Sequence, residues 1–225
     1  DPALAFQLNA SRQLCRTLGI CEMASKDYEA DDLIASTATK IRTSGAQPIV
    51  VSRDKDLMQV IKPSDLYWDF GQSKMKDQAQ LEEKLGFRCD QMAEFLALVG
   101  DASDSIRGVP GLGAKTATQL LGHFSCINDI LANTEKVGTL PIRGAAKIAA
   151  KIVECSEQLR LSRQLASIVQ EVDSVPNYDE IAWTGVHSDA FALFCEEMGF
   201  GESFNYRVKQ LKQRSRKDIT QNFTG

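Results

Sequence analysis

The sequence is poor in the side chains on which several common catalytic mechanisms depend. Its 225 residues include only two histidines, His123 and His187, and neither stands near a cluster of acidic residues. Imidazole-based acid–base catalysis is therefore disfavoured, and a serine or cysteine nucleophile would lack its usual base. The six cysteines form no Cys-x-x-Cys pair, which argues against a thiolate zinc site and favours reduced thiols. We therefore expect a reducing compartment, the cytoplasm or an organelle.

Long apolar runs and a net positive charge are also missing. No stretch is long enough to span a bilayer, and the N-terminus lacks a basic-then-apolar signal pattern, so we expect no membrane partner. The 26 basic and 30 acidic residues give a formal charge of −4, which excludes a uniformly basic nucleic-acid coat but not a local basic face. A hydrophobic fraction of 43% is enough for one large or two small globular cores.

The first 75 residues alternate between helical and strand patterns. Apolar spacing predicts helices, and β-branched runs predict strands, in the order helix 4–18, helix 28–43, buried strand 48–52, helix 57–61 and strand 66–70. This alternation favours an α/β fold, with a partial parallel sheet covered by helices.

Residues 76–175 are predicted to be entirely helical. Helix-like periodicity covers residues 76–85, 90–99, 114–122, 125–132, 144–154 and 156–169. We therefore expect three segments: an α/β core over residues 1–75, a helical region over 76–175 and an extension over 176–225. The extension suggests a helix over residues 183–199 and a basic tail, Arg207–Lys217, which either continues a nucleic-acid track or is a solvated end.

Seven carboxylates fall in three short clusters, each at a junction between predicted elements. They are Glu29, Asp31, Asp32, Asp54, Asp56, Asp101 and Asp104. Side chains just beyond the carboxyl ends of parallel strands converge on one crevice, where bare carboxylates would repel one another strongly. Ligation by oxygen alone favours Mg²⁺ or Mn²⁺, and two such ions about 4 Å apart can promote phosphodiester cleavage.

Each acidic cluster also has a simpler interpretation when it is taken alone. Acids in the first turn of a helix favour capping, Asp54 and Asp56 could form a solvated turn, and the last pair could be loop residues. The coincidence of three clusters at three junctions favours a metal site. Lys55, between two candidate ligands, could reach a scissile phosphate or be an ordinary surface lysine.

A glycine-rich turn, Gly108–Thr116, joins two predicted helices. Glycines allow positive φ and let backbone amides approach a phosphate, and the helix that begins near Ala114 directs its positive end to the same place. Lys115 and Thr116 can add direct contacts that hold a strand without reading its sequence. The turn is not a Walker loop, and alone it could be a plain helix–turn–helix connection.

Several motifs, taken together and in order, resemble the 5′ nuclease superfamily of flap endonucleases, phage 5′ exonucleases and the N-terminal domain of bacterial DNA polymerase I. They are Tyr28–Ile34, Val51–Gln59 and Leu98–Ala117, and Arg143–Ala166 is similar to the polymerase I nuclease domain in particular. The resemblance covers roughly residues 1–175. It implies a PIN-like core and two-metal hydrolysis of DNA from a 5′ end or at a flap, in replication and repair.

The resemblance also implies roles for particular residues. Glu29 and Asp31 match ligands of a first metal site, and Asp54, Asp56 and Asp101 match ligands of a second. Asp32 and Asp104 match extra acids of the bacterial branch. The turn 108–116 looks like a helix–hairpin–helix element that binds duplex DNA and often a K⁺ ion. The DNA-binding residues implied by this match and by the similar turn 140–147 are Gly108, Val109, Gly111, Leu112, Gly113, Lys115, Thr116, Arg143 and Lys147.

One feature of the superfamily has no match here. Its members begin with an aspartate-bearing strand and a basic helical arch, whereas 28 residues precede Glu29 and hold only Asp1, Glu22 and Asp27 as acids. We therefore expect the first strand, two metal ligands and the arch to be absent from this sequence. Two functions remain open: a monomeric two-metal exonuclease or flap endonuclease acting on DNA ends, flaps and junctions without sequence specificity, and a non-catalytic DNA-binding module. A related RNase is less favoured.

Overall fold

The computed structural model describes residues 1–202, 204 and 206, and the chain forms two compact units. Unit 1 consists of Asp1–Lys26 with the chain from Ser174 onward, and unit 2 is Asp27–Asp173. This division differs from the three predicted segments, because the predicted α/β core and helical region share unit 2 and the first helix belongs to unit 1. The basic tail Arg207–Lys217 lies outside the described residues.

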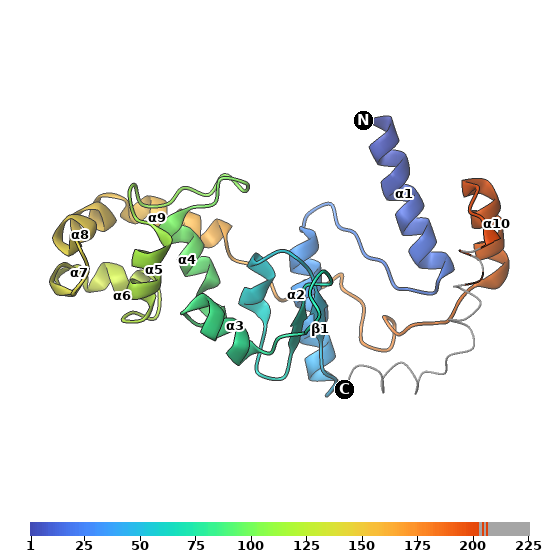
Figure 1. Cartoon of the computed structure of the whole chain (residues 1–225), viewed down its shortest axis with the longest axis horizontal. Coiled ribbons are helices and arrows are strands. Elements are labelled where there is room, and N and C mark those ends of the chain that lie inside the picture. The colour runs from blue at the N-terminus through green and yellow to red at the C-terminus, as the bar shows by residue number, and fades with distance from the viewer. Residues whose placement is uncertain (203, 205, 207–225) are drawn as a thin grey trace. The chain divides into compact units, whose positions relative to one another are not determined.

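Unit 1 is built on two helices, α1 (Pro2–Thr17) and α10 (Ser188–Met198) (Figure 1). Phe191 and Cys195 on α10 are buried and pack against Leu14 and Leu18. Helix α1 ends where the sequence predicts, because Gly19 takes a φ of +71°. A Cβ at Gly19 would lie 2.0 Å from the carbonyl oxygen of Gly185, so glycine is required by close approach as well as by backbone conformation.

Helix α10 begins later than the predicted range 183–199. The indole N–H of Trp183 donates to the Leu18 carbonyl at 2.7 Å, and the amide of Thr184 donates to the Gly19 carbonyl at 3.1 Å. The amide of His187 donates to the Thr17 carbonyl at 2.9 Å. Residues 183–187 are therefore not helical, because their donors are bound to the end of α1.

Unit 2 begins with a small parallel sheet next to a helix. Its elements here are α2 (Ala30–Thr43), β1 (Ile49–Val51), the 3₁₀-helix η1 (Asp56–Val60) and β2 (Leu66–Trp68). The strands pair in parallel, with Val50 opposite Tyr67. The α/β class is confirmed, but the prediction of a fully buried strand was wrong: Val50 is buried, whereas Ile49 is 37% and Val51 is 53% exposed. Only Val50 points into the core, so the strand alternates as a half-buried strand does.

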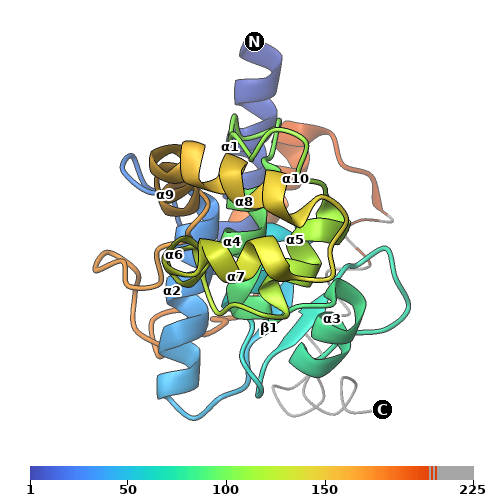
Figure 2. The ribbon, with the colours of Figure 1, turned by 90° about the vertical axis from the view of Figure 1, so that its left-hand side faces the viewer.

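Helices make up the remainder of unit 2. They are α3 (Gln78–Leu85), the 3₁₀-helix η2 (Cys89–Gln91), α4 (Met92–Val99), α5 (Ala114–Leu121), α6 (Ile127–Ala132), α7 (Thr134–Thr139), α8 (Ala145–Glu154) and α9 (Ser156–Leu165). Figure 2 shows α7 beside α8, the pair with the most extensive contact. Helix α7 was not predicted, because six residues that include Gly138 are too short for a clear period.

One hydrophobic core runs through unit 2 from the sheet to the last helix. Leu57, Leu96, Leu120 and Leu159 are each at most 1% exposed and belong to the same cluster. Burial of a leucine side chain of this kind contributes about 1.5–3 kcal/mol. The sheet and the helices therefore fold as one packed body. In the described part of the chain, no helix is both long and apolar enough to cross a membrane.

The predicted helix 156–169 ends at Leu165, and the chain then turns back. We call residues 166–172 the return segment. The Gln59 side chain accepts from the amide of Ile168 at 3.0 Å and donates to the carbonyl of Ala166 at 3.1 Å. The Ser36 hydroxyl accepts from the amide of Val172 at 3.0 Å. These bonds fasten the end of the helical part to η1 and α2.

Candidate metal centre and nucleic-acid interface

Three carboxylates from two distant segments meet at one point of unit 2. Asp56 begins η1, just beyond β1, whereas Asp101 and Asp104 follow α4. Ligand oxygens of these three residues all lie within 4.8 Å of one another. Three of the seven carboxylates singled out in the sequence, from two of the three clusters, therefore lie together, and we call these three residues the acidic cluster.

The first predicted acidic group lies within electrostatic reach of the acidic cluster. The pKa of Asp31, in the first turn of α2, is raised by burial and then by the charges of Asp54, Glu29, Asp32 and Asp104. Carboxylates from α2, the end of β1 and the loop after α4 therefore act on one another. Asp54 and Glu29 are exposed.

Asp56 carries the strongest sign of an incomplete site. Its Oδ1 atom is buried and has no hydrogen-bond partner among the described residues. The pKa of Asp56 is raised to about 6, first by burial and then by the charge of Asp54, which Lys55 partly offsets. A buried, unpartnered carboxylate oxygen is unfavourable unless something compensates it. An oxygen-only donor set of this kind fits a hard divalent cation.

Asp101 is held in its charged form by its neighbours. The hydroxyl of Ser103 donates to its Oδ1 atom in a short hydrogen bond, and the amide of Ser103 donates to the same oxygen at 2.9 Å. Lys55 Nζ donates to Oδ2 at 2.9 Å. The hydrogen bond from the Ser103 hydroxyl and that from Lys55 lower the pKa of Asp101 to about 2. The sequence analysis missed Ser103. The Asp-x-Ser pattern could have indicated it, because an aspartate carboxylate often accepts a hydrogen bond from the residue two positions later.

Lys55 brings a positive charge to the carboxylates. Its hydrogen bond to Asp101 raises the pKa of the ammonium group, which therefore stays protonated. The loop that carries Lys55 is fixed by the hydroxyl of Tyr67, which donates to the Asp54 carbonyl at 2.9 Å. The lysine therefore contacts a carboxylate of the acidic cluster, and its contact with a scissile phosphate stays a prediction.

Two glycines position the loop that carries Asp101. The amides and carbonyls of Asp101 and Ile106 exchange hydrogen bonds of 2.9 and 2.8 Å, which close the loop. Gly100 has a φ of +80°, and a Cβ on Gly108 would lie 2.3 Å from the carbonyl carbon of Val99. Gly108 is therefore needed so that two backbone segments can touch, a structural role beside its predicted place in the DNA interface.

Asp32 has a different environment from the other predicted ligands. Its Oδ1 atom accepts from the amide of Val169 at 2.8 Å, and its Oδ2 atom accepts from the amide of Glu29 at 3.2 Å. Both carboxylate oxygens are thus bound to backbone amides of the return segment and of the start of α2. This favours the capping interpretation for Asp32, whose role as a metal ligand stays a prediction.

The glycine-rich turn is longer than a tight hairpin, because α4 ends at Val99 and α5 begins at Ala114. The side chains of Val109 and Leu112 are 3% and 5% exposed and belong to the core, so the backbone alone could contact a ligand there. Gly113 precedes α5 without a side-chain cap, which leaves first-turn amides available. Gly111, Gly113 and Lys115 are exposed, and Thr116 is half-buried.

A second basic turn precedes α8. Arg143 and Lys147 are exposed, and Gly144 at the start of the helix has a φ of +78°. Lys151, one helical turn beyond Lys147 on the same face, donates to the Pro110 carbonyl at 2.6 Å. The basic face of α8 is therefore joined to the glycine-rich turn, and the two predicted DNA-binding segments are neighbours.

These features define a class of proteins: an α/β core with a cluster of carboxylates, followed by helices with exposed glycine turns. Residues 1–86 match the family model described as 5′-3′ exonuclease, N-terminal resolvase-like domain. Residues 87–189 match the model described as 5′-3′ exonuclease, C-terminal SAM fold. The chain belongs to the 5′-3′ exonuclease family.

Curated relatives carry the same family names. A 5′-3′ exonuclease of Buchnera aphidicola is 36% identical over 169 residues, which are 75% of this chain and 59% of that protein. The flap endonuclease Xni of Shewanella amazonensis is 35% identical over 76% of this chain and 64% of its own length. DNA polymerase I of Bacillus caldotenax is 30% identical over 97% of this chain and 24% of its own. The chain thus spans less than two thirds of these relatives.

Solved structures share the fold. The T5 5′-exonuclease with bound divalent metal ions (zinc) matches with a TM-score of 0.57 and 22% identity, over 78% of this chain and 60% of that one. The catalytic core of Rad2 in complex with DNA substrate matches with a TM-score of 0.63 and 14% identity, over 96% of this chain and 71% of that one. This likeness shows that the chain has the fold of these solved structures.

Proposed function

We propose that this protein is a divalent-metal-dependent nuclease that hydrolyses DNA phosphodiester bonds from a 5′ end or at a flap. The observation that carries the proposal is the acidic cluster, with its three carboxylates within 4.8 Å and the buried Asp56 oxygen that has no partner among the described residues. Membership of a family whose relatives are named 5′-3′ exonuclease and flap endonuclease supports the type of reaction.

The cation in this proposal is Mg²⁺ or Mn²⁺, because every candidate ligand is a carboxylate oxygen. Asp56, Asp101 and Asp104 would hold one ion, and Glu29, Asp31 and Asp54 would hold a second. Bound ions of this kind lower the pKa of a coordinated water and stabilise the leaving oxygen. Lys55, whose ammonium group lies against Asp101, would bind a phosphate oxygen at the same site.

We propose that DNA is held through its backbone, without sequence specificity, by a monomer in the cytoplasm. The exposed glycine-rich turn and the exposed side chains of Lys115, Arg143 and Lys147 support a phosphate-binding role. A K⁺ ion at the glycine-rich turn is part of the proposal. The Pro110 carbonyl already accepts from the Lys151 ammonium, which supports a preference for cations at this turn.

Cleavage of a 5′-flap duplex in Mg²⁺ tests the proposal. We expect Asp56→Asn and Asp101→Asn each to lower the cleavage rate at least about a hundredfold, because each removes a charged ligand from the metal site. Asp173→Asn is the matched control, since Asp173 is an exposed aspartate of unit 2 outside the acidic cluster. EDTA should abolish cleavage.

Binding of the duplex in KCl and in NaCl at equal ionic strength tests the K⁺ site.

Two results would contradict this function. The first is cleavage by Asp56→Asn and Asp101→Asn at the rate of Asp173→Asn. The second is salt-sensitive binding of the duplex without any EDTA-sensitive product, which would favour the non-catalytic DNA-binding module. Matched DNA and RNA flaps in the same assay separate a DNase from a related RNase.

A further inference from the structure

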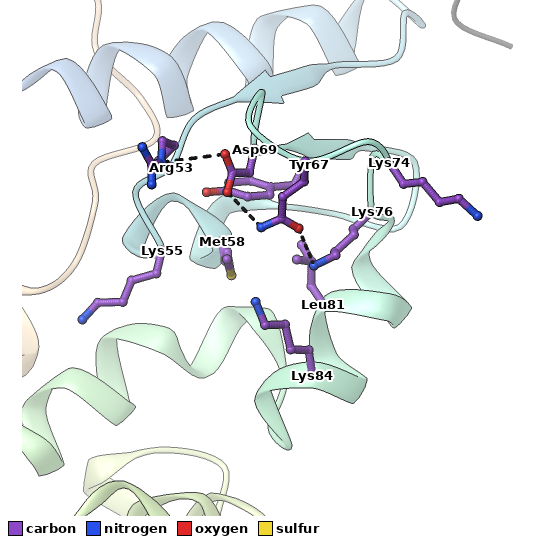
Figure 3. A pocket seen from close by; sticks show the side chains of 10 residues that line it. Arg53, Lys55, Met58, Tyr67, Asp69, Lys74, Lys76, Leu81 and Lys84 are labelled. Atoms are coloured by element: carbon purple, nitrogen blue, oxygen red, sulfur yellow. Dashed lines mark hydrogen bonds and ion pairs between the residues drawn. The ribbon is translucent and has the colours of Figure 1, made fainter. Parts of the chain in front are cut away.

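A basic pocket lies on the β2 side of the loop that carries Asp54 and Asp56, and the sequence analysis did not predict it. It has a volume of ≈170 Å³. Its charged lining comes from the loop after β1, the segment after β2 and helix α3 (Figure 3). These side chains are Arg53, Lys55, Asp69, Lys74, Lys76 and Lys84.

The positive charge in this pocket is only partly balanced. Arg53 Nε lies 3.9 Å from Asp69 Oδ1, a loose ion pair, and Asp69 also accepts from the amide of Gly71 and the side chain of Gln72. Lys76 and Lys84 form no ion pair with any carboxylate in the described part of the chain. Cations gathered in this way attract an anion.

Of the cationic side chains that line the pocket, three are directed so that they could bind an anion inside it. Figure 3 shows the Lys84 ammonium and the Lys76 ammonium directed into the pocket, whereas Lys74 points away from it. Lys55 also points away, toward Asp101, to which it donates at 2.9 Å. Arg53 lies at the rim of the pocket, next to Asp69. An anion in the pocket would therefore meet Arg53, Lys76 and Lys84.

The pocket shares a wall with the candidate metal site. Lys55 belongs to both, because it lines the pocket and ion-pairs with Asp101. Tyr67, another wall residue, donates its hydroxyl to the Asp54 carbonyl. Successive phosphates along a nucleic-acid strand are close together, about 3.4 Å apart along the helix axis. A strand with one phosphate at the acidic cluster would carry its neighbouring phosphates close to Lys55, the residue that lines both sites.

We propose that Arg53, Lys76 and Lys84 form a phosphate subsite that holds a phosphate group of the DNA strand beside the acidic cluster. The volume suits one phosphate group better than a whole small-molecule ligand, for which pockets of about 300 Å³ or more are usual. The arginine offers a planar fork and the lysines offer point charges, and both are good phosphate ligands. The subsite rests on the proposed function, because it assumes a DNA strand at the acidic cluster.

The test measures binding of a 5′-flap duplex in EDTA, without turnover, by the double variant Lys76→Gln/Lys84→Gln. We expect its Kd to rise about tenfold, because charge-assisted hydrogen bonds to one phosphate are lost. The plot of the logarithm of the binding constant against the logarithm of salt concentration has a negative slope. The magnitude of this slope should be smaller by about 1 in the variant. Lys62→Gln is the matched control, since Lys62 lies in the turn before β2, at the opposite end of that strand from Asp69.

The charge-keeping variant Lys76→Arg/Lys84→Arg separates loss of charge from damage to the fold, and it should recover most of the affinity. Two duplexes, one with a 5′-phosphate and one with a 5′-hydroxyl on the flap, identify the source of the phosphate. If the glutamine variant weakens both equally, the subsite holds an internal diester. If it weakens only the 5′-phosphorylated duplex, the subsite holds the terminal phosphate.

The subsite is overturned if Lys76→Gln/Lys84→Gln binds no worse than Lys62→Gln, if the arginine variant fails to recover affinity, or if the wild-type chain binds neither duplex. Cleavage in Mg²⁺ is measured separately. Absent cleavage with the expected differences in affinity contradicts the nuclease and leaves the subsite. Normal cleavage with unchanged affinity contradicts the subsite and leaves the nuclease.

Discussion

At the scale of single residues, Asp56 and Asp101 are two carboxyls of one site with opposite electrostatic environments. Burial and neighbouring charge raise the pKa of Asp56 to about 6, whereas Ser103 and Lys55 lower the pKa of Asp101 to about 2. Such a separation is typical of functional sites. It also means that the two residues contribute to stability with opposite signs.

The stability of the metal-free protein should depend on pH through these residues. A carboxyl with a raised pKa binds more protons in the folded state, so its contribution to stability falls as pH rises through about 4 to 6. At pH 7.5 in EDTA we therefore expect Asp56→Asn to increase the free energy of unfolding by about 1 kcal/mol, after allowance for solvent screening. The gain should vanish near pH 4. Urea unfolding of the variant and the wild type at both pH values measures it.

Asp101→Asn is the matched comparison, and its expected change in the free energy of unfolding has the opposite sign. The lowered pKa of Asp101 contributes stability that is present at neutral pH and is lost as pH falls toward 2. This variant should be less stable than the wild type at pH 7.5. Equal shifts in the same direction for both variants would contradict the electrostatic description of the site. With Mn²⁺ added, both variants should lose the stabilisation that a bound ion gives the wild type.

The sequence identifies the carboxylates but not their division of roles. Their places at junctions of predicted elements can be read from the sequence. Side chains beyond the carboxyl ends of parallel strands converge on one crevice, so such places indicate a shared site. The orphaned oxygen of Asp56 and the bond between Lys55 and Asp101 depend on side chains from separate segments, which no local pattern reveals. The same holds for Asp32, where the amide that occupies its Oδ1 atom belongs to the distant return segment.

At the scale of elements, the longer helices were predictable and the short or half-covered elements were not. Helices α8 and α9 follow a clear apolar period, so their cores could be located within a few residues. The burial of β1 could not be predicted, because a short apolar run does not tell which of its faces is covered. The end of α9 could not be placed either, since tertiary hydrogen bonds to Gln59 compete with the helix.

The loop after α4 should depend on the close approach at Gly108. A Cβ there would lie 2.3 Å from the carbonyl carbon of Val99 and 2.4 Å from the amide nitrogen of Gly100, so the backbones must separate. We expect Gly108→Ala to lower the free energy of unfolding by about 1–3 kcal/mol, as over-packing does. Because Asp101 is on the displaced segment, Mn²⁺ affinity should fall as well. Thermal unfolding with and without Mn²⁺ measures both effects.

Gly113→Ala is the matched control for that substitution. Its φ is −94°, and among the described residues no atom lies within 4 Å of a Cβ built there. Alanine should therefore be tolerated with little change in stability and with unchanged Mn²⁺ affinity. If the two alanine variants behave alike, close packing does not explain Gly108.

At the scale of the whole molecule, the chain divides by packing rather than by position in the sequence. Helix α1 belongs with the segment from Ser174 onward, and a single core connects the sheet of unit 2 to α9. Composition and periodicity could not predict this grouping, because it depends on which apolar faces meet. The predicted boundary near residue 75 separates two fold types along the chain, but it does not separate two cores.

This organisation predicts that residues 27–173 fold and bind metal without the rest of the chain. The core, the acidic cluster and the basic pocket are all drawn from these residues. A fragment of this length is large enough for a cooperative core, so it should unfold in one thermal transition. Since a ligand stabilises only through the state that binds it, Mn²⁺ should raise the Tm of the fragment as much as that of the full chain. A fragment that melts without cooperativity would mean that unit 2 needs unit 1 to fold. A cooperative fragment with no Mn²⁺ shift would place the metal site outside the carboxylates assigned to it.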